Sequence, residues 1–197
     1  MVAKLLEAAG ALFLERGYDK TTTNHIAERA GVSTGSLYQF FPDKAAMLVA
    51  LQDEWVAKLH TGMDAALADA GEDVPLEVIV DRVLNIHVTL NQEPPGLLGF
   101  LLVTLGPTDQ VHSPTATATI GRVEELIALR GLPMPAERRQ VVTQLAVHIV
   151  SAIYYLGGPG GPANTELMRQ IRQALLAYLG PLERRRATSQ AGIHAGA

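Results

Sequence analysis

The segment from Thr34 to Gln39 carries small or hydrogen-bonding side chains at every position except Leu37, and it carries no charge. Hydroxyl and amide groups of this kind donate and accept hydrogen bonds, which suits them to phosphate oxygens and to the edges of nucleic-acid bases. They reach such partners without the large desolvation cost of a charged group. The alternative is an ordinary helical corner with solvated polar faces, and helical periodicity alone does not separate the two interpretations.

Two short helices with a tight turn between them must position these side chains. Thr22 is the expected N-cap of the first helix, Gly31 stands at the turn, and Ser33 is the expected N-cap of the second helix, which runs to about Phe40. A helix-turn-helix unit places its second helix in the major groove of DNA while the first crosses the backbone. The backbone amides at both helix N-termini can also point at phosphate oxygens.

The sequence offers little to other kinds of chemistry. Its 197 residues include no cysteine, which excludes a disulfide, a cysteine-ligated metal and a thiol nucleophile. His87 and His148 have no carboxylate at a paired spacing, so we expect no metal site. The serines have no recognisable base arrangement and there is no paired-carboxylate motif, so we expect neither catalytic residues nor a cofactor, and we predict that the chain is not an enzyme.

The net charge of −4 is distributed unevenly along the chain. Residues 1–45 are neutral, residues 46–182 carry −6, and the remainder from Glu183 carries +2. The acidity therefore lies in the centre of the chain and does not argue against a nucleic-acid partner for the N-terminal segment.

Helical periodicity dominates the chain, and no segment shows the sustained alternation of an exposed strand. We predict an all-α fold of about nine helices, with a connection at residues 157–162 and a frayed end from Arg184. The longest strongly apolar stretch, Leu97 to Leu105, is far shorter than the roughly 20 residues that span a bilayer, so we predict no membrane association.

Residues 22–44, TTNHIAERAGVSTGSLYQFFPDK, resemble the DNA-binding signature of the TetR family of transcriptional regulators, TetR/AcrR type. The signature places a threonine, then Ile-Ala, then Ala-Gly-Val-Ser and a glycine, then a tyrosine and a lysine in the register found here. The family's first helix is matched as well, by Ala8-Ala9, Leu12-Phe13 and Gly17-Tyr18. The rest of the chain matches the family only as a long helical body.

The resemblance implies a set of DNA-contacting positions on the first helices. Three of these positions would chiefly hold phosphates: Thr22, Tyr38 and Lys44. The others would face bases or lie beside them: Thr23, Asn24, Thr34, Gly35 and Ser36.

The chain departs from the family pattern at two positions. Phe40 stands where the family often has a histidine that contacts phosphate, and Val2 occupies a position that is often arginine in a basic N-terminal arm. We expect Phe40 and Phe41 to lie in the core of the small N-terminal domain instead. Both departures predict weaker contact with the DNA backbone.

The resemblance also implies a division of the chain. Residues 1–45 would form a three-helix helix-turn-helix DNA-binding domain, residues 46–183 a larger helical ligand-binding and dimerisation domain, and residues 184–197 a flexible tail. The apolar helices predicted at about 136–156 and 165–182 would pair with their symmetry mates as a four-helix dimer seam. Burial within a monomer is the alternative for the last helix.

The predicted helix at 136–156 carries a polar stripe within a mostly apolar sequence, formed by Gln144, His148, Ser151 and Tyr155. Such a stripe needs partners if it is buried, so it is a candidate lining for a ligand cavity. A solvated face or polar contacts in a dimer seam are the alternatives. Aromatic, methionine and scattered polar residues on three earlier helices are further candidates. These are Trp55, Leu59, Met63, His87, Asn91, Phe100 and Thr104.

Taken together, the residues and the resemblance predict a cytoplasmic, homodimeric, ligand-responsive transcriptional regulator. Its partners would be a near-palindromic double-stranded DNA operator and a small hydrophobic effector, and it would act as a repressor that the effector releases. The alternative is a DNA-binding regulator whose helical body is controlled by a partner protein.

Overall fold

The computed structural model describes residues 1–194 except residues 72, 92–95, 105–113, 131 and 133. Within these residues the chain forms nine α-helices, one short 3-10 helix and no strand, so the predicted all-α fold is confirmed. In chain order the elements are α1 (Val2–Arg16), α2 (Thr23–Ala30), α3 (Thr34–Tyr38), α4 (Lys44–Leu67), α5 (Leu76–Leu90), α6 (Leu97–Thr104), α8 (Pro114–Leu129), α9 (Ala136–Gly157), the 3-10 helix η1 (Gly158–Ala163) and α10 (Thr165–His194).

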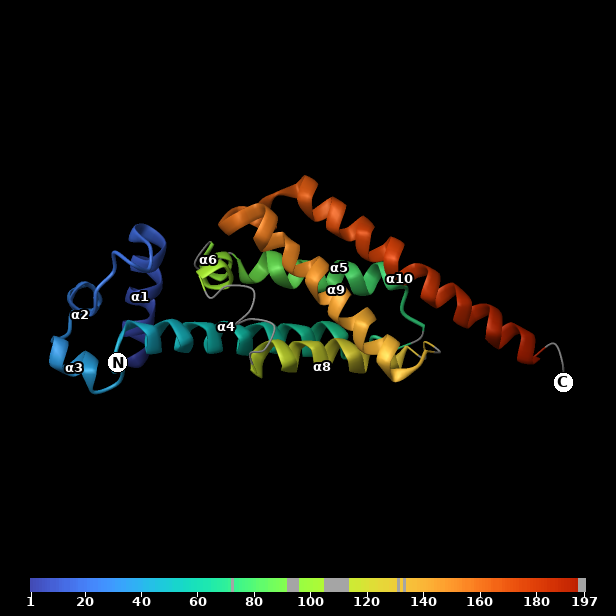
Figure 1. Ribbon diagram of the computed structural model, residues 1–197, viewed down its shortest axis with the longest axis horizontal. Helices are drawn as coiled ribbons and strands as arrows, with labels where there is room; N and C mark the ends of the chain where they lie inside the picture. Colours follow the sequence, from blue (N-terminus) through green and yellow to red (C-terminus); the bar gives the residue numbers. More distant parts are fainter. Residues whose placement is uncertain (72, 92–95, 105–113, 131, 133, 195–197) are drawn as a thin grey trace.

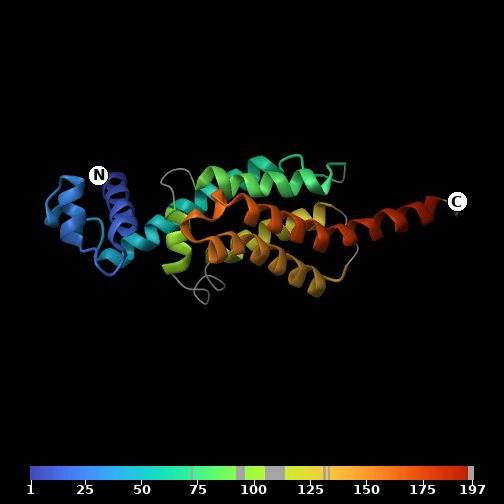
Figure 2. The ribbon, with the colours of Figure 1, turned by 90° about the horizontal axis from the view of Figure 1, so that it is seen from above.

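The molecule is elongated, and its helices form two groups (Figure 1). The N-terminal domain, made of α1, α2 and α3, lies at one end, and α4 leads from it into the body, where it packs against α5 and α8. The body comprises α4 to α10. Figure 2 shows α10 extending from the body at the end opposite the N-terminal domain.

Local side chains set the starts of the first helices, as the sequence predicts. Thr22 Oγ1 accepts the His25 amide at 3.2 Å while Nδ1 of His25 accepts the Thr22 amide at 3.4 Å, which completes a capping box on α2. Ser33 and Asp43 accept backbone amides at the starts of α3 and α4, at 3.1 and 2.7 Å. Gly31 ends α2 with a φ of 67°, in the left-handed region that favours glycine.

The core of the N-terminal domain extends into the body. Phe13, Ile26 and Leu37 are fully buried at its centre, one from each helix of the domain. Leu97 and Leu101 of α6 belong to the same cluster of buried side chains. The predicted boundary at residue 45 therefore does not separate two cores, because a body helix contributes to the packing of the N-terminal domain.

Two predictions about the C-terminal part of the chain are wrong. The expected connection at residues 157–162 is largely the 3-10 helix η1, which packs against α9. Glycine permits this contact, because a Cβ built on Gly161 would lie 2.0 Å from the carbonyl oxygen of Ile153. The last helix does not end near Leu182, since α10 continues to His194.

α9 is an apolar helix that the rest of the chain covers only in part. Among the described residues it is the one helix that is long and apolar enough to cross a membrane. The core helix of a soluble protein can have the same length and composition. Within the most apolar stretch of α9, 28% of the residues are buried. Ala146, Ile153 and Tyr154 pack into the core of the body. The opposite face leaves Val141 and Leu156 60% and 75% exposed.

Candidate functional site

The predicted DNA-contacting side chains of α2 and α3 come together as hydrogen-bonded pairs on one surface. The Thr23 and Tyr38 hydroxyls lie 3.1 Å apart, and the Thr34 hydroxyl donates to Oδ1 of Asn24 at 3.5 Å. Tyr38 is 52% exposed, so its hydroxyl is held by Thr23 without being buried. The pairs fix the outward side chains of α3 relative to α2, which prearranges the surface before any partner binds.

The capping side chains lie beside these pairs. The Ser36 hydroxyl contacts the Ser33 hydroxyl at 2.9 Å, and the exposed Thr22 hydroxyl caps α2. Gly35 is exposed at the start of α3, and a Cβ built on it would meet only the Ser33 hydroxyl, at 3.8 Å. The backbone of α3 is therefore open to close approach at this position. The predicted positions on α2 and α3 thus form a continuous, uncharged, hydrogen-bonding surface.

Lys44, at the start of α4, has its hydrogen-bond partners in the connection between α1 and α2. Its Nζ donates to the carbonyl oxygens of Tyr18 and Thr21 at 2.8 and 3.1 Å, and it lies 4.2 Å from the centre of the Tyr18 ring. Partial burial raises the pKa of Tyr18, with the carboxylates of Asp43 and Asp19 adding to the effect. The ammonium group therefore anchors the connection between α1 and α2, and its contact with phosphate stays a prediction.

The two phenylalanines after α3 have opposite environments. Phe41 is 8% exposed and packs in the core of the N-terminal domain, as expected. Phe40 is 46% exposed, so the expectation that it is a core residue is wrong. The difference follows from a turn that allows only one of two successive residues to face inward. An aromatic ring therefore lies at the surface at the position where the resembling family often has histidine.

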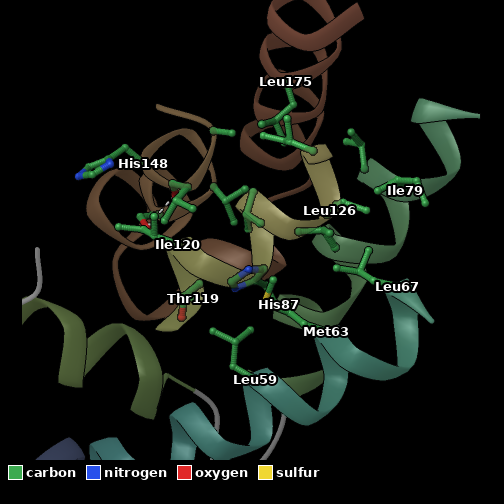
Figure 3. A pocket seen from close by; sticks show the side chains of 18 of the residues that line it. Leu59, Met63, Leu67, Ile79, His87, Thr119, Ile120, Leu126, His148 and Leu175 are labelled. Atoms are coloured by element: carbon green, nitrogen blue, oxygen red, sulfur yellow. Dashed lines mark hydrogen bonds between the residues drawn. The ribbon is translucent and has the colours of Figure 1, made fainter. Parts of the chain in front are cut away.

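A cavity of about 210 Å³ lies inside the body, between α4, α5, α8, α9 and α10 (Figure 3). Its lining is almost entirely aliphatic and aromatic, with Leu59 and Met63 from α4, Ile79 from α5 and Leu126 from α8 among the side chains. It is larger than the apolar cavity of about 150 Å³ that accepts benzene in another protein. The cavity therefore has room for a small apolar molecule.

Seven of the eleven predicted ligand-binding residues line this cavity: Trp55, Leu59, Met63, His87, His148, Ser151 and Tyr155. The other four do not: Asn91, Phe100, Thr104 and Gln144. Asn91 accepts the Gly96 amide after α5, and Phe100 stacks on Phe13 in the N-terminal core. Phe100 thus serves the N-terminal domain, whereas its neighbour Leu101 on α6 lines the cavity, a difference that the apolar pattern of α6 does not reveal.

Three members of the predicted polar stripe of α9 line the cavity, and Gln144 does not. Gln144 and His148 are joined by a hydrogen bond of 2.6 Å from the histidine Nδ1 to the backbone carbonyl, and His148 is exposed. Figure 3 shows the His148 ring pointing away from the other lining side chains. Ser151 donates to the Val147 carbonyl at 3.0 Å. Carbonyls of the helix therefore satisfy His148 and Ser151, and the role of the stripe in ligand binding stays a prediction.

The polar centre of the cavity is a pair that combines one predicted residue with one missed residue. Nδ1 of His87 and the Tyr154 hydroxyl lie 2.9 Å apart, and the side chains are 8% and 1% exposed. Burial lowers the pKa of His87 to about 4 and raises that of Tyr154, so both groups are neutral at neutral pH. Tyr154 of α9 faces His87, whereas the sequence prediction named its neighbour Tyr155. The choice between these two residues depends on the rotation of the helix about its axis.

Polar contacts close the far end of the cavity around Arg130. Its guanidinium donates to Glu183 of α10 at 2.5 Å and to the carbonyls of Gly71 and Val74 at 3.1 and 2.9 Å. Arg130 is 4% exposed, so this buried cation is compensated by a carboxylate and two carbonyl dipoles. The contact ties α8 and α10 to the connection between α4 and α5.

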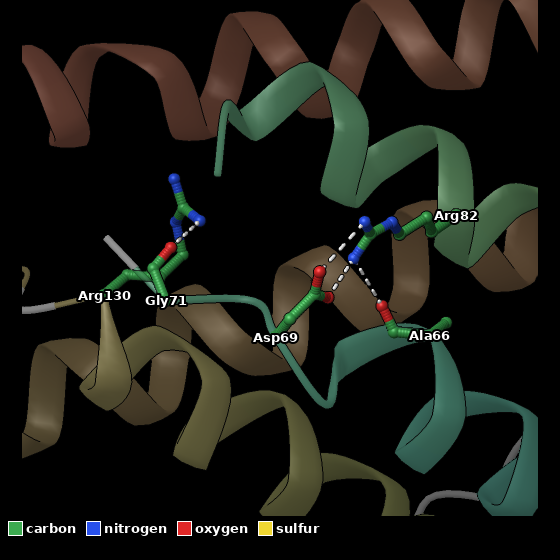
Figure 4. Close-up of polar contacts among 5 residues, drawn as sticks. All are labelled: Ala66, Asp69, Gly71, Arg82 and Arg130. Atoms are coloured by element: carbon green, nitrogen blue, oxygen red, sulfur yellow. Dashed lines mark hydrogen bonds and ion pairs between the residues drawn. The ribbon is translucent and has the colours of Figure 1, made fainter. Parts of the chain in front are cut away.

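A second arginine holds the same connection from the side of α5. Arg82 pairs with the Asp69 carboxylate and donates to the Ala66 carbonyl at 3.1 Å, as Figure 4 shows together with the Arg130 to Gly71 bond. The hydrogen bond from Arg82 lowers the pKa of Asp69. These contacts fix the end of α4, which forms one wall of the cavity.

The residues described so far define a class of protein. A helix-turn-helix unit with an exposed hydrogen-bonding second helix is joined to a helical body that contains an apolar cavity, which is the organisation of a DNA-binding protein with a separate helical body.

Comparison with known proteins identifies the family of the N-terminal domain and the fold of the whole chain. Residues 5–51 match the family described as "Bacterial regulatory proteins, tetR family". A TetR-family regulator from Streptomyces coelicolor has the same fold, with a TM-score of 0.65 and 23% identity over 92% of this chain and 98% of that one. Residues 5–51 therefore match the N-terminal domain of the TetR family, and the chain as a whole has the fold of a TetR-family regulator, in agreement with the resemblance seen in the sequence.

Two further relatives define how far the likeness extends. The HTH-type transcriptional regulator TtgR of Pseudomonas putida is 42% identical over 84 residues, 43% of this chain and 40% of TtgR. SmeT of Stenotrophomonas maltophilia, a repressor of a multidrug efflux pump, has a TM-score of 0.65 with 18% identity over 92% of this chain and 89% of SmeT. The chain spans less than half the length of the curated relatives it matches in sequence.

Proposed function

We propose that the chain is a homodimeric transcriptional repressor, which binds a near-palindromic operator and releases it when a small hydrophobic effector enters the cavity. The observation that carries the proposal is the position of α6. Leu101 is 1% exposed, belongs to the buried cluster of the N-terminal domain, and also lines the cavity. A ligand that displaces α6 therefore acts directly on the packing of α1 and, through it, on the orientation of α2 and α3.

The prearranged surface of α2 and α3 supports operator binding. Thr34, Gly35 and Ser36 are the proposed base-reading positions, and Thr22 and Tyr38 hold the backbone. The surface has no charge of its own, so hydroxyl groups and helix N-termini supply the contacts. Each N-terminal domain then contributes modest affinity, and a dimer that engages two half-sites gains the rest.

The exposed apolar face of α9 supports dimerisation. Val141, Leu145 and Leu156 are large, exposed and spaced to lie along one side of the helix, and the adjoining α10 leaves Leu176 half-buried. A face of this kind is stable in water when a second copy covers it with the same residues across a two-fold axis. Covering by a second copy also accounts for the low burial of α9 without a membrane.

SmeT supports the proposed mode of control. That repressor is also solved as a complex with triclosan, with a TM-score of 0.61 to this chain. A fold that carries a small-molecule complex in a repressor of this kind is consistent with an effector in the cavity of this chain. We therefore assign release, rather than recruitment, to the ligand.

Selection of bound fragments from random DNA, with the full chain at low salt, tests the function. We expect a near-palindromic sequence to be enriched, and we expect the enrichment to disappear when a hydrophobic effector is added. Absence of any enriched sequence would contradict DNA binding. An enriched sequence that no small molecule displaces would instead favour control by a partner protein.

Light scattering on size-exclusion chromatography tests the dimer. Leu145→Glu places a charge on the proposed seam, and we expect a monomer that binds the operator at least tenfold more weakly. Leu129→Glu is the matched control, because Leu129 is 68% exposed on α8, outside the seam. Equal masses for both variants would refute the assignment of this face.

A further inference from the structure

The interior of the cavity presents Nε2 of His87, a polar atom that has no hydrogen-bond partner among the described residues. Nδ1 of His87 is occupied by the Tyr154 hydroxyl at 2.9 Å, and among the described residues nothing hydrogen bonds to Nε2. Figure 3 places the His87 ring at the centre of the lining side chains, surrounded by aliphatic residues of α4, α5 and α8. An apolar molecule that fills the cavity therefore meets this atom, whereas the unpartnered Nε1 of the lining residue Trp55 has almost no accessible surface.

The cavity offers no unpaired charge to a ligand. Among the described lining residues the charged ones are Arg130 and Glu183, which pair with each other at 2.5 Å. A carboxylate or an ammonium group that entered this space would lose its hydration without gaining an opposite charge, a cost that exceeds the gain of a single hydrogen bond. The lining therefore discriminates against charged molecules.

We propose that the effector is an uncharged, largely apolar molecule with one oxygen function, an alcohol, phenol or ketone, and that this oxygen hydrogen bonds to Nε2 of His87. This inference rests on the proposed function, because it names the ligand of the same cavity. The neutral ring has one donor and one acceptor nitrogen, and the Tyr154 hydroxyl either donates to Nδ1 or accepts from it. Nε2 is accordingly a donor in one tautomer and an acceptor in the other, so hydroxyl ligands fit both tautomers and ketones fit the first.

The orientation of the His87 ring is the structural basis of this selectivity. The Tyr154 hydroxyl fixes Nδ1, and the tilted rings lie with their centres 5.7 Å apart. Burial keeps the pKa of His87 near 4, so the ring stays uncharged when a ligand approaches at neutral pH. Tyr154 is thus a positioning residue, whereas His87 contacts the ligand.

Fluorescence of Trp55 measures binding without DNA, because Trp55 is the single tryptophan of the chain and lines the cavity. The probes are octan-1-ol, octanoate and octylammonium, which share a chain length and differ in charge. We expect octan-1-ol to bind at least tenfold more tightly than either ion. Equal or tighter binding of octanoate would overturn the inference by placing the head group at Arg130, and no binding of any probe would also overturn it.

Matched variants locate the hydrogen bond. We expect His87→Leu to weaken octan-1-ol binding by about tenfold, the equivalent of one hydrogen bond, and Tyr154→Phe to weaken it less. Gln144→Leu is the control on the same helix as Tyr154, since Gln144 lies outside the lining, and it should leave binding unchanged. If His87→Leu does not fold, the fully apolar double variant His87→Leu/Tyr154→Phe replaces it. Unchanged octan-1-ol affinity in the folded variant would refute the contact with His87.

The operator complex separates this inference from the proposed function. Octan-1-ol that binds selectively but leaves DNA affinity unchanged would contradict effector control while the ligand class stands. Charged probes that bind best and also release DNA would support effector control and overturn the ligand class.

Discussion

The surface on α2 and α3 and the cavity of the body are built in opposite ways. The surface is made from residues between positions 22 and 40, each held by a partner within fifteen positions, such as Tyr38 by Thr23. The cavity collects side chains from positions 52 to 183, and its polar pair, His87 and Tyr154, is 67 positions apart. The first is a locally determined structure, and the second exists only when the whole body is packed.

The two regions also use polarity differently. The surface presents hydroxyl groups to solvent with their partners in place, so they need no rearrangement to meet a backbone or a base. The cavity hides one neutral polar pair among apolar side chains, where a hydrogen bond is electrostatically stronger and a charge is costly. In the proposed function, specificity for nucleic acid depends on the positions of the surface hydroxyl groups. Specificity for the ligand depends on the exclusion of charged molecules from the cavity.

The largest predicted effect tests whether the two regions are one cooperative unit. Leu101→Ala removes a side chain that packs in the buried cluster of the N-terminal domain and also lines the cavity. We expect the free energy of unfolding to fall by about 3 kcal/mol. Urea unfolding followed by Trp55 fluorescence and by far-UV circular dichroism should give coincident transitions. Leu129→Ala, at an exposed position, is the control and should unfold like the parent. Two separated transitions would show that the N-terminal domain and the body unfold independently, contrary to the inference from α6.

The buried histidine makes the stability of the body depend on pH. Because the folded-state pKa of His87 is lowered from 6.5 to about 4, the unfolded chain binds more protons between these values. The stabilisation is present above pH 6.5 and is lost as the pH falls towards 4, by about 2 kcal/mol between pH 7.5 and pH 5.

Urea unfolding at both pH values, compared between the parent and His87→Leu, measures this contribution. The comparison is necessary because burial also lowers the pKa of His60, which is unchanged in the variant. We expect the variant to lose most of the difference in stability between the two pH values. The same loss of stability in both proteins would show that His87 is accessible to protons in the folded state.

The contrast between the regions also explains what the sequence predicts well. Caps at Thr22, Ser33 and Asp43 and the turn at Gly31 depend on neighbours two to four positions away, so residue types alone locate α2 and α3. The resemblance to a known signature extends the prediction to the outward positions. Lys44 is the exception, because its partners in the connection between α1 and α2 lie more than twenty positions earlier.

Prediction of the cavity is limited by helix rotation and long-range packing. Apolar periodicity gives the helices of the body, but it does not distinguish a side chain that lines a cavity from one that fills a core. Tyr155 and Tyr154 are equally aromatic, and only the packing of α9 against α5 makes Tyr154 the partner of His87. Phe100 likewise stacks in the N-terminal domain because α6 turns towards α1.

A smaller effect tests the hydrogen-bonding role of the surface. Tyr38→Phe removes the exposed hydroxyl and its contact with Thr23, and we expect operator affinity to fall about fivefold to tenfold, within the range for one hydrogen bond. Because the ring is half exposed, the free energy of unfolding should change little. Fluorescence anisotropy with the selected operator and with unrelated DNA should show equal losses if Tyr38 holds phosphate. A loss for the operator alone would reassign Tyr38 to base reading.

The smallest predicted effect comes from the exposed ring of Phe40. Phe40→His adds a group that becomes cationic below a pKa near 6.5 and can then contact a phosphate, so operator affinity should rise about threefold at pH 5.5 relative to the parent. The comparison with the parent cancels any contribution of His25. Since Phe40 is 46% exposed, stability should remain unchanged, which separates this position from the buried Phe41. If Phe40→His instead weakens binding at every pH, the aromatic ring itself makes an apolar contact with the DNA, and this uncharged surface is adapted to use it.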